Sequence, residues 1–281
     1  MHDILMITYK RPAFTRLSLA RLLESCDPSM RVWVWHNGDH AETLDVVRSF
    51  EGHPRLYKLR VSPENVKLRA PTNWFWANSN GAYLSKVDDD CLMPDAWGER
   101  LRRVQDDEVA LGMVGTWLFY EEDFVPELAA RKLRTVGGSH QIMVHGFVQG
   151  SGYVMKRAVY LKLGPLRKRE SFTGYCIRAA YRGWTNGWLY PFIHQDHMDD
   201  ARSPHFPYRT ETQFLENLSL SKKQFSVATL AEAKEFSQAL ARRLQTDVID
   251  PSSYFGWRGF MRRLKRKFKI SNGVENSVAV S

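Results

Sequence analysis

The chain has 281 residues, of which 43% are hydrophobic and 25% are charged, and its formal net charge is +9. This composition excludes a wholly disordered chain, a collagen and a long coiled coil, and the length fits one large α/β domain or two small ones. The longest nearly apolar run, Val109–Tyr120, is shorter than the roughly 20 residues of a membrane-spanning helix. No secretory signal is expected at the N-terminus. Three scattered cysteines indicate a reducing cytoplasm.

The first two-thirds of the chain alternate between strand and helix patterns. Strand patterns lie at Asp3–Thr8, Val32–Trp35, Leu56–Val61 and Ala82–Val87, and helix patterns lie at Ala13–Ser25, Ala41–Phe50 and Thr72–Asn80. Pro12 stands where a first helical residue is tolerated, and Thr72 is the expected N-cap of the third helix. This alternation predicts an α/β fold with a mixed, mostly parallel sheet flanked by helices.

Two more segments after the fourth strand have a clear pattern. Ser171 is the expected N-cap of a helix whose apolar face begins at Phe172, and Trp188–Ile193 reads as a strand. Residues 120–150 show no readable pattern. Beyond residue 207 the alternation ends, and Thr229–Glu232 is a capping-box pattern that opens a helix to about residue 244.

Asp88-Asp89-Asp90 is the strongest local feature, because it ends a strand that is otherwise apolar. Ligands of parallel sheets bind beyond the carboxyl ends of the strands. Three adjacent carboxylates repel one another, and a divalent cation relieves that repulsion. Hard oxygen ligands suit Mg²⁺ or Mn²⁺, particularly where a diphosphate supplies further oxygens. An acidic turn that caps the next helix is the simpler alternative.

The stretch from Asn73 to Pro94 resembles the central motif of GT-A-fold glycosyltransferases, especially family 2. In that family an Asn-containing helix precedes a strand that ends in a DxD motif, followed shortly by Pro, as in Asp88–Asp90 and Pro94 here. Further similar segments follow in the family's order, and the resemblance covers about residues 3–205. They are the first strand with Tyr9, Lys10 and Arg11, then Asn37, Gly150–Gly164 and Arg178–Gly183.

The resemblance implies a role for each matching residue. Asp90 would coordinate the metal, Mn²⁺ or Mg²⁺, that bridges a donor diphosphate, and Asp88 would contact that metal or the ribose. The nucleotide would be held by residues of the first strand, the second strand and the central motif: Thr8, Tyr9, Arg11, Asn37, Asn73, Asp88 and Asp89. The physical reason holds without the family, since a cation neutralises the charge that develops on a departing nucleoside diphosphate.

A His-rich stretch, residues 194–205, offers a third metal ligand, because neutral imidazole is a common one. His197 is the expected ligand and His194 is the competing choice. A histidine with only a structural role is the plain alternative for either position.

The sequence departs from the family at the catalytic base. An inverting transfer needs a carboxylate that accepts the proton of the acceptor hydroxyl. The Glu-Asp pair that the family places at the start of the helix carrying Arg178 is missing, and only Glu170 is acidic there. The candidates are Glu170, Asp199 and Asp200, and an ordinary helix-start carboxylate is the alternative for Glu170.

The basic residues concentrate near the C-terminus. Seven Lys/Arg and no acid lie between Tyr254 and Ile270, so the rest of the chain carries +2 of the net +9. Apolar residues fall on one helical face: Trp257, Phe260, Met261, Leu264 and Phe268. This pattern predicts a cationic amphipathic helix over residues 257–269 that lies on an anionic membrane surface. A helix packed on the domain is the alternative, and no nucleic acid is expected.

Together these features predict a glycosyltransferase that moves a sugar from a nucleoside-diphosphate donor, with UDP-sugar expected, to a glycan or lipid-linked acceptor in surface polysaccharide synthesis. The alternatives are a sugar-nucleotide nucleotidyltransferase and a non-catalytic membrane-binding protein on the same scaffold. We expect a catalytic domain at 1–205, with a nucleotide-binding part to about residue 95 and an acceptor-side part after it. A helical extension at 206–250 and an amphipathic helix with a disordered tail at 251–281 follow. The expected location is the cytoplasmic face of the membrane.

Overall fold

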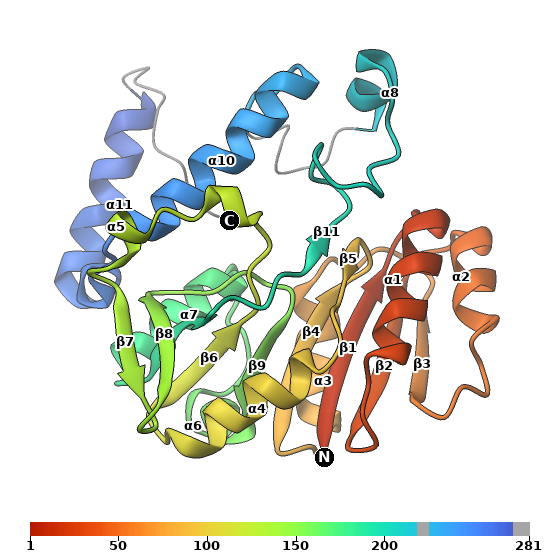
Figure 1. Ribbon diagram of the computed structural model, residues 1–281, viewed down its shortest axis with the longest axis horizontal. Coiled ribbons are helices and arrows are strands. Elements are labelled where there is room, and N and C mark those ends of the chain that lie inside the picture. Colours follow the sequence, from red (N-terminus) through yellow and green to blue (C-terminus); the bar gives the residue numbers. More distant parts are fainter. Residues whose placement is uncertain (218–224, 272–281) are drawn as a thin grey trace.

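A mixed sheet of nine strands forms the centre of the protein. The computed structural model describes residues 1–217 and 225–271. The strand order is β3-β2-β1-β4-β9-β6-β10-β8-β7, and helices cover both faces of the sheet (Figure 1). A separate two-stranded ribbon is formed by β5 and β11.

The elements have the following bounds. The strands are β1 His2–Thr8, β2 Met30–Asn37, β3 Leu56–Ser62, β4 Tyr83–Asp88, β5 Cys91–Leu92, β6 Leu111–Gly115, β7 Leu133–Val136, β8 His140–His145, β9 Tyr153–Lys156, β10 Thr185–Tyr190 and β11 Asp196–His197. The α-helices are α1 Pro12–Glu24, α2 Ala41–Arg48, α3 Arg69–Asn78, α4 Trp97–Asp107, α5 Pro126–Ala129, α6 Arg157–Leu163, α7 Phe172–Tyr181, α8 Glu211–Glu216, α10 Leu230–Thr246 and α11 Gly256–Ser271. Short 3₁₀ helices span Glu121–Asp123 (η1) and Pro251–Tyr254 (η2).

Three of the four parallel pairs of the mixed sheet lie in its N-terminal half, and the fourth joins β6 and β10. Strands β3, β2, β1 and β4 run parallel, whereas β9 is antiparallel to both of its neighbours and β7 and β8 form an antiparallel hairpin. The expected mixed α/β sheet is therefore confirmed. The sequence predicted this half from its hydrophobic runs, because β1 and β2 are almost wholly buried and therefore carry long apolar stretches, whereas β3 is more exposed.

Two elements, α3 and β10, begin three residues earlier than predicted, and the boundaries of the other predicted elements shift by up to two residues. Thr72 does not cap α3: the helix begins at Arg69, and the Thr72 hydroxyl donates to the Leu68 carbonyl inside it. Pro71 lies in the first turn, where the missing N–H has no helical partner to lose. The strand predicted at 188–193 is β10 and ends at Tyr190. The caps predicted at Ser171 and Thr229 are present, each side chain accepting from a backbone N–H of the first turn.

Two apolar cores lie on the two faces of the sheet, and β1 supplies both. Ile4 and Met6 pack with α1 and α4, and Leu5 and Ile7 pack with α3 and α7 on the other face. Successive strand residues point to opposite faces, so a run of apolar residues fills both layers. In Figure 1, α1 and α4 lie in front of the sheet and α3 and α7 behind it. This burial fixes where β1 and β4 end, which is where the site forms.

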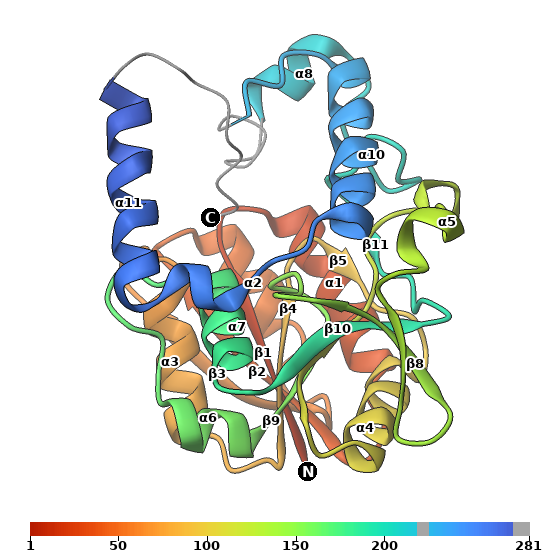
Figure 2. The same cartoon turned by 90° about the vertical axis from the view of Figure 1, so that its left-hand side faces the viewer.

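The C-terminal helices stand at the end of the sheet where the parallel strands finish (Figure 2). The segment around α8 and α10 has a small core of its own, formed by Phe206, Phe214, Val227 and Ala233. Helix α11 covers the residues predicted as amphipathic and ends at Ser271, the first residue of the predicted disordered tail, 271–281. The rest of that tail lies outside the described residues. Within the described ranges, no helix is both long enough and apolar enough to cross a membrane.

Candidate active site

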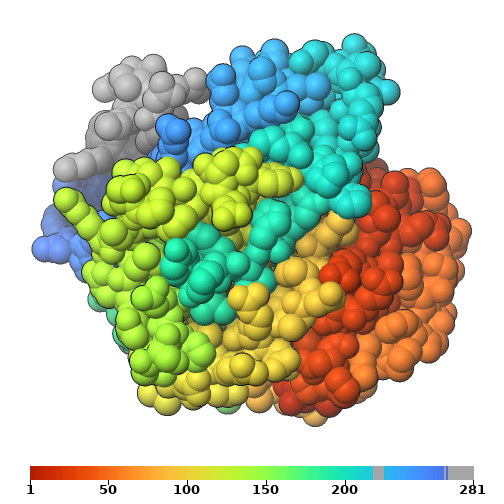
Figure 3. All heavy atoms as spheres, in the orientation of Figure 1, coloured from red at the N-terminus to blue at the C-terminus, as the bar shows by residue number. Residues whose placement is uncertain are grey.

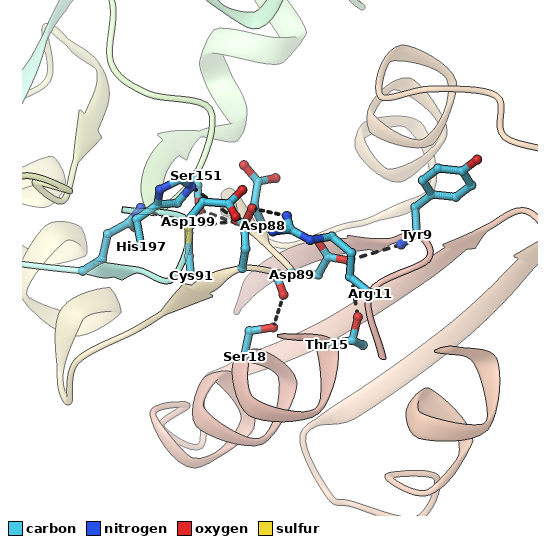
Figure 4. Close-up of polar contacts among 12 residues, drawn as sticks. Tyr9, Arg11, Thr15, Ser18, Asp88, Asp89, Cys91, Ser151, His197 and Asp199 are labelled. Atoms are coloured by element: carbon cyan, nitrogen blue, oxygen red, sulfur yellow. Dashed lines mark hydrogen bonds and ion pairs between the residues drawn. The ribbon is translucent and has the colours of Figure 1, made fainter. Parts of the chain in front are cut away.

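The site forms where β1 and β4 end side by side. These strands are parallel and in register, with Ile7 opposite Asp88, so the loop after β1 and the Asp88–Asp90 triplet meet at one edge of the sheet. Helix α1 begins in that loop, with Pro12 in its first turn. The start of α1, with Arg11 and Thr15, therefore lies beside the carboxylates (Figure 4), and the positive end of a helix dipole favours negative charge there.

Arg11 connects two carboxylates from distant parts of the chain. One guanidinium nitrogen donates to Asp90 Oδ2 at 2.7 Å and the other to Asp199 Oδ1 at 2.6 Å. Both aspartates are nearly buried. Burial disfavours the charge on Arg11, but the charges of Asp90 and Asp199 outweigh it and raise the Arg11 pKa. Arg11 thus offsets negative charge at the place where the sequence predicted a cation.

Asp89 is held by the start of α1. Its Oδ2 accepts from the Tyr9 backbone N–H at 3.2 Å and from the Thr15 hydroxyl at 3.3 Å, while its carbonyl accepts from the Ser18 hydroxyl at 2.8 Å. Burial first, and then the charge of Asp90, raise the Asp89 pKa to about 7. Asp89 therefore ties the triplet to α1 instead of facing the opening.

Asp90 presents its other oxygen to the β5–β11 ribbon. His197 Nε2 lies 3.6 Å from Asp90 Oδ1, and the Cys91 thiol lies 3.5 Å from the same oxygen. Burial favours the neutral form of Asp90, yet the charges of His197 and Arg11 prevail and lower its pKa. Donor atoms of Asp90, Cys91 and His197 all lie within 4.8 Å of one another. Such a set of oxygen, sulfur and nitrogen donors fits a divalent metal ion.

Asp88 is the most open member of the triplet. It forms an ion pair with Lys86, two residues earlier on β4, and its backbone N–H donates to the Ser151 hydroxyl at 3.0 Å. The Asp88 side chain is 37% exposed, whereas that of Lys86 is 5% exposed. The buried cation therefore holds Asp88 at the edge of the site with its carboxylate accessible.

The nucleotide-side candidates lie on the same edge of the sheet. Thr8 Oγ1 is 3.0 Å from His36 Nδ1, which links the ends of β1 and β2. The Asn37 amide donates to Asn65 at 2.8 Å and accepts from the Val66 backbone N–H at 2.9 Å, so it shapes the loop after β3. The Tyr9 ring points away from the aspartates in Figure 4. Nucleotide contact by these residues stays a prediction.

Four of the predicted site residues form hydrogen bonds with groups outside the Asp90 cluster. Glu170 accepts two hydrogen bonds at 2.8 Å from the buried guanidinium of Arg178. Asp200 accepts from Arg202 in the same way, at 3.0 and 2.8 Å. Asn73 bonds both backbone polar groups of Leu166 through its amide. His194 Nδ1 lies 3.0 Å from the Phe119 carbonyl, so His197 is the histidine that the structure brings to Asp90.

Sequence reasoning missed the residues that position this cluster. The sequence pattern does not distinguish Cys91 from the other scattered cysteines, although it directly follows the triplet. Thr15 and Ser18, one helical turn apart on α1, both contact Asp89, and the hydroxyls on this helix face were the available signal. The contact between residues near 90 and near 200 had no local signal. In Figure 3 the teal segment that includes β11 runs diagonally across this face against the yellow segment.

Comparison with known proteins identifies the class. The sequence profile of glycosyl transferase family 2 matches residues 3–162, more than half of the chain. The chain therefore belongs to glycosyl transferase family 2 and is a glycosyltransferase. The profile ends before His197 and Asp199, so those residues lie outside the matched segment. No curated protein sequence matches the chain.

Solved structures agree on the fold. The chain is similar to the mannosyltransferase PcManGT from Pyrobaculum calidifontis in complex with GDP-Man and Mn²⁺, at 15% identity and a TM-score of 0.58, over 95% of this chain and 80% of that one. It is also similar to S. aureus TarS in complex with UDP-GlcNAc, at 13% identity and a TM-score of 0.57, over 98% and 76% of the two chains. At these identities the likeness shows the fold, which confirms the expected GT-A-type architecture.

Proposed function

We propose that this protein is a metal-dependent transferase that moves a sugar from a nucleoside-diphosphate donor to a glycan or lipid-linked acceptor with inversion. The observation that carries the proposal is the position of Asp90, at the end of β4 between Arg11 and His197. The family match and the fold shared with proteins that hold GDP-Man or UDP-GlcNAc support a nucleotide-sugar donor. UDP-sugar remains the expected donor.

The donor side of the reaction follows from the placement of charge. Asp90 and His197 would hold Mn²⁺ or Mg²⁺, and Asp88 lies close enough to the edge to contact the same ion or the ribose. The bound cation supplies charge neutralisation for the departing diphosphate. Arg11, at the start of α1, is placed to donate to phosphate oxygens, as is the N-terminus of that helix. Both are fixed before substrate arrives, so little reorganisation is needed.

Asp199 is the proposed base among the three candidates. Glu170 and Asp200 each accept two charge-assisted hydrogen bonds from an arginine outside the cluster, whereas Asp199 is held by Arg11 beside Asp90. A carboxylate next to the donor site is placed to accept the proton of an acceptor hydroxyl. Asp199→Asn should lower kcat at least about 100-fold with donor binding retained. Loss of donor binding with kcat unchanged would assign Asp199 to the donor site instead.

Calorimetric titration of UDP or GDP, with and without Mn²⁺, tests the donor proposal. Wild type should bind at least one of them only with Mn²⁺ present, and Asp90→Ala should lose this binding. Glu99→Ala, an exposed carboxylate on α4, is the matched control and should bind as wild type does. Wild-type protein that binds neither nucleotide with Mn²⁺ present would refute the proposal.

The C-terminal helix supports a place on an anionic membrane surface, on the cytoplasmic side. Trp257 and Phe260 stack on each other at 5.4 Å and are 74% and 46% exposed. Arg262 packs over the Tyr254 ring at 3.6 Å, so the start of the helix is anchored to η2 while its apolar side chains stay in solvent. Exposed apolar side chains beside a row of cations favour the membrane over a helix packed on the domain.

Liposome flotation tests this placement. Trp257→Ala with Phe260→Ala should release the protein from vesicles containing anionic lipid. Leu161→Ala on α6, which is 72% exposed and apolar, should leave flotation unchanged. Flotation of the double variant equal to wild type would show that α11 is not the anchor.

A further inference from the structure

The Cys91 thiol adds a sulfur donor to the expected metal site, and neither the family match nor the resemblance assigns such a ligand. We propose that Asp90, Cys91 and His197 form a tetrahedral-type site that binds Zn²⁺ or Co²⁺ in preference to Mg²⁺, with the sulfur as a direct ligand. The inference deepens the proposed function at the same position, and its test does not depend on sugar transfer.

The ribbon between β5 and β11 places the sulfur and the imidazole together. Cys91 and His197 are direct partners in this antiparallel pair, so their side chains project from the same face. The backbone N–H of Met198 donates to the Asp90 carbonyl at 2.9 Å and extends the pairing by one residue. Backbone pairing, and not chance contact of long side chains, therefore brings the three donors together.

The two spacings that join Asp90 Oδ1 to the other donors match tetrahedral bond geometry, and the sulfur and the imidazole nitrogen lie within 4.8 Å of each other. Zinc bonds of about 2.1 Å to oxygen, 2.3 Å to sulfur and 2.0 Å to nitrogen, at tetrahedral angles, separate oxygen from sulfur by about 3.6 Å and oxygen from nitrogen by about 3.4 Å. The Cys91 sulfur lies 3.5 Å and the His197 Nε2 lies 3.6 Å from Asp90 Oδ1. Octahedral Mg²⁺ bonds would need about 2.9 Å between oxygen and nitrogen and prefer oxygen ligands throughout.

The surroundings leave these donors available to a metal. Arg11 occupies Asp90 Oδ2, so Oδ1 is the oxygen that faces Cys91 and His197. The side chain of Gln195 donates to the Cys91 sulfur at 3.5 Å, and its carbonyl oxygen is held by the Thr116 hydroxyl at 2.7 Å. A donor aimed at the sulfur stabilises a metal-bound thiolate.

A metal ion can enter this site, and the thiol proton that it displaces can leave. The His197 side chain is 31% exposed, whereas Asp90 is 12% exposed and Cys91 is buried, so an ion reaches the site from the imidazole side. As the metal–sulfur bond forms, the thiol proton leaves to solvent, which makes binding a metal-for-proton exchange. Borderline metals favour sulfur and nitrogen donors, whereas Mg²⁺ favours oxygen, and this difference sets the selectivity.

Absorption spectroscopy of the full chain with Co²⁺ tests sulfur ligation. A thiolate bound to Co²⁺ gives an intense charge-transfer band in the near ultraviolet, which we expect for wild type. Cys91→Ser should lose the band. Cys26→Ser, which removes another unpaired thiol, should keep it. Absence of the band in wild type, or its survival in Cys91→Ser, would overturn the proposal even if the enzyme transferred sugar with Mn²⁺.

Calorimetric titration separates ligation from a folding defect. Cys91→Ser and Cys91→Ala, each with a wild-type circular dichroism spectrum, should bind Zn²⁺ at least about tenfold more weakly and Mg²⁺ within about threefold of wild type. Equal loss of affinity for both metals would show that the thiol is not a selective ligand. A thiolate band in a protein that transfers no sugar would leave this proposal intact and refute the proposed function.

Discussion

Replacing Glu170 distinguishes a structural carboxylate from a catalytic base. The Arg178 guanidinium is 3% exposed and donates to both Glu170 oxygens at 2.8 Å and to the carbonyls of Leu163 and Pro165 at 2.7 and 3.0 Å. Glu170→Ala leaves this buried cation without its counter-charge, which costs about 3–5 kcal/mol. Glu170→Gln keeps one acceptor and should cost about 2 kcal/mol.

Thermal unfolding gives the first measurement. For a chain of this size about 1 kcal/mol corresponds to a few degrees, so Glu170→Ala should melt roughly 10 °C below wild type and Glu170→Gln less. In a double-mutant cycle, Arg178→Met with Glu170→Gln should cost less than the sum of the two single variants, because the buried cation that lacked its counter-charge is gone. Glu51→Ala, an exposed carboxylate after α2, is the control and should melt as wild type does.

Transfer activity gives the second measurement, at a temperature where every variant is folded. A structural role predicts that Glu170→Gln keeps kcat within about threefold of wild type. A base would lose at least about 100-fold on the same change, since Gln accepts no proton. A loss of that size in Glu170→Gln, with melting unchanged, would refute the structural reading and move the base to this residue.

Three further changes test the frame of the site. Gly152→Ala should destabilise the protein by about 3 kcal/mol and weaken metal binding. The reason is that φ of Gly152 is +67° and an added Cβ would lie 1.9 Å from the Gln195 side chain. An unchanged melting temperature would contradict this. Arg11→Ala should cost about 2 kcal/mol in EDTA, because two buried carboxylates lose the guanidinium that pairs with both of them. Mn²⁺ should then raise the melting temperature of Arg11→Ala more than that of wild type. Equal shifts in the two proteins would count against charge replacement. Burial lowers the Lys132 pKa from 10.5 to about 8, so the unfolded chain binds more protons between these values and this group makes stability rise with pH. Lys132→Met should lack this rise between pH 8 and 10, measured by denaturant unfolding, and equal slopes in both proteins would argue against it.

The parallel half of the fold could be predicted because its signals are local. β1 and β4 read as apolar runs, and the Asp triplet marks the end of β4. The hairpin of β7 and β8 was missed because β7, Leu133–Val136, has only two apolar residues. Its turn did carry a signal: Gly137 and Gly138 both adopt positive φ, which hairpin turns favour.

The candidate site was predictable only where one segment carries it. The choice between His194 and His197 depends on β11 pairing with β5, and a two-residue ribbon leaves no periodic pattern. Similarly, a carboxylate near a helix start has the same local sequence whether it serves as a base or as the partner of a buried arginine. Only the packing of Arg178 beneath Glu170 separates the two.

The β5–β11 ribbon also orders events during synthesis. Cys91 leaves the ribosome more than a hundred residues before His197, and β10, which joins the sheet between β6 and β8, lies between them in the sequence. A nascent chain can thus complete the first four strands while its donor pocket is still half-built. Affinity for the nucleotide-sugar donor should therefore appear late in synthesis, after β11 has paired with β5.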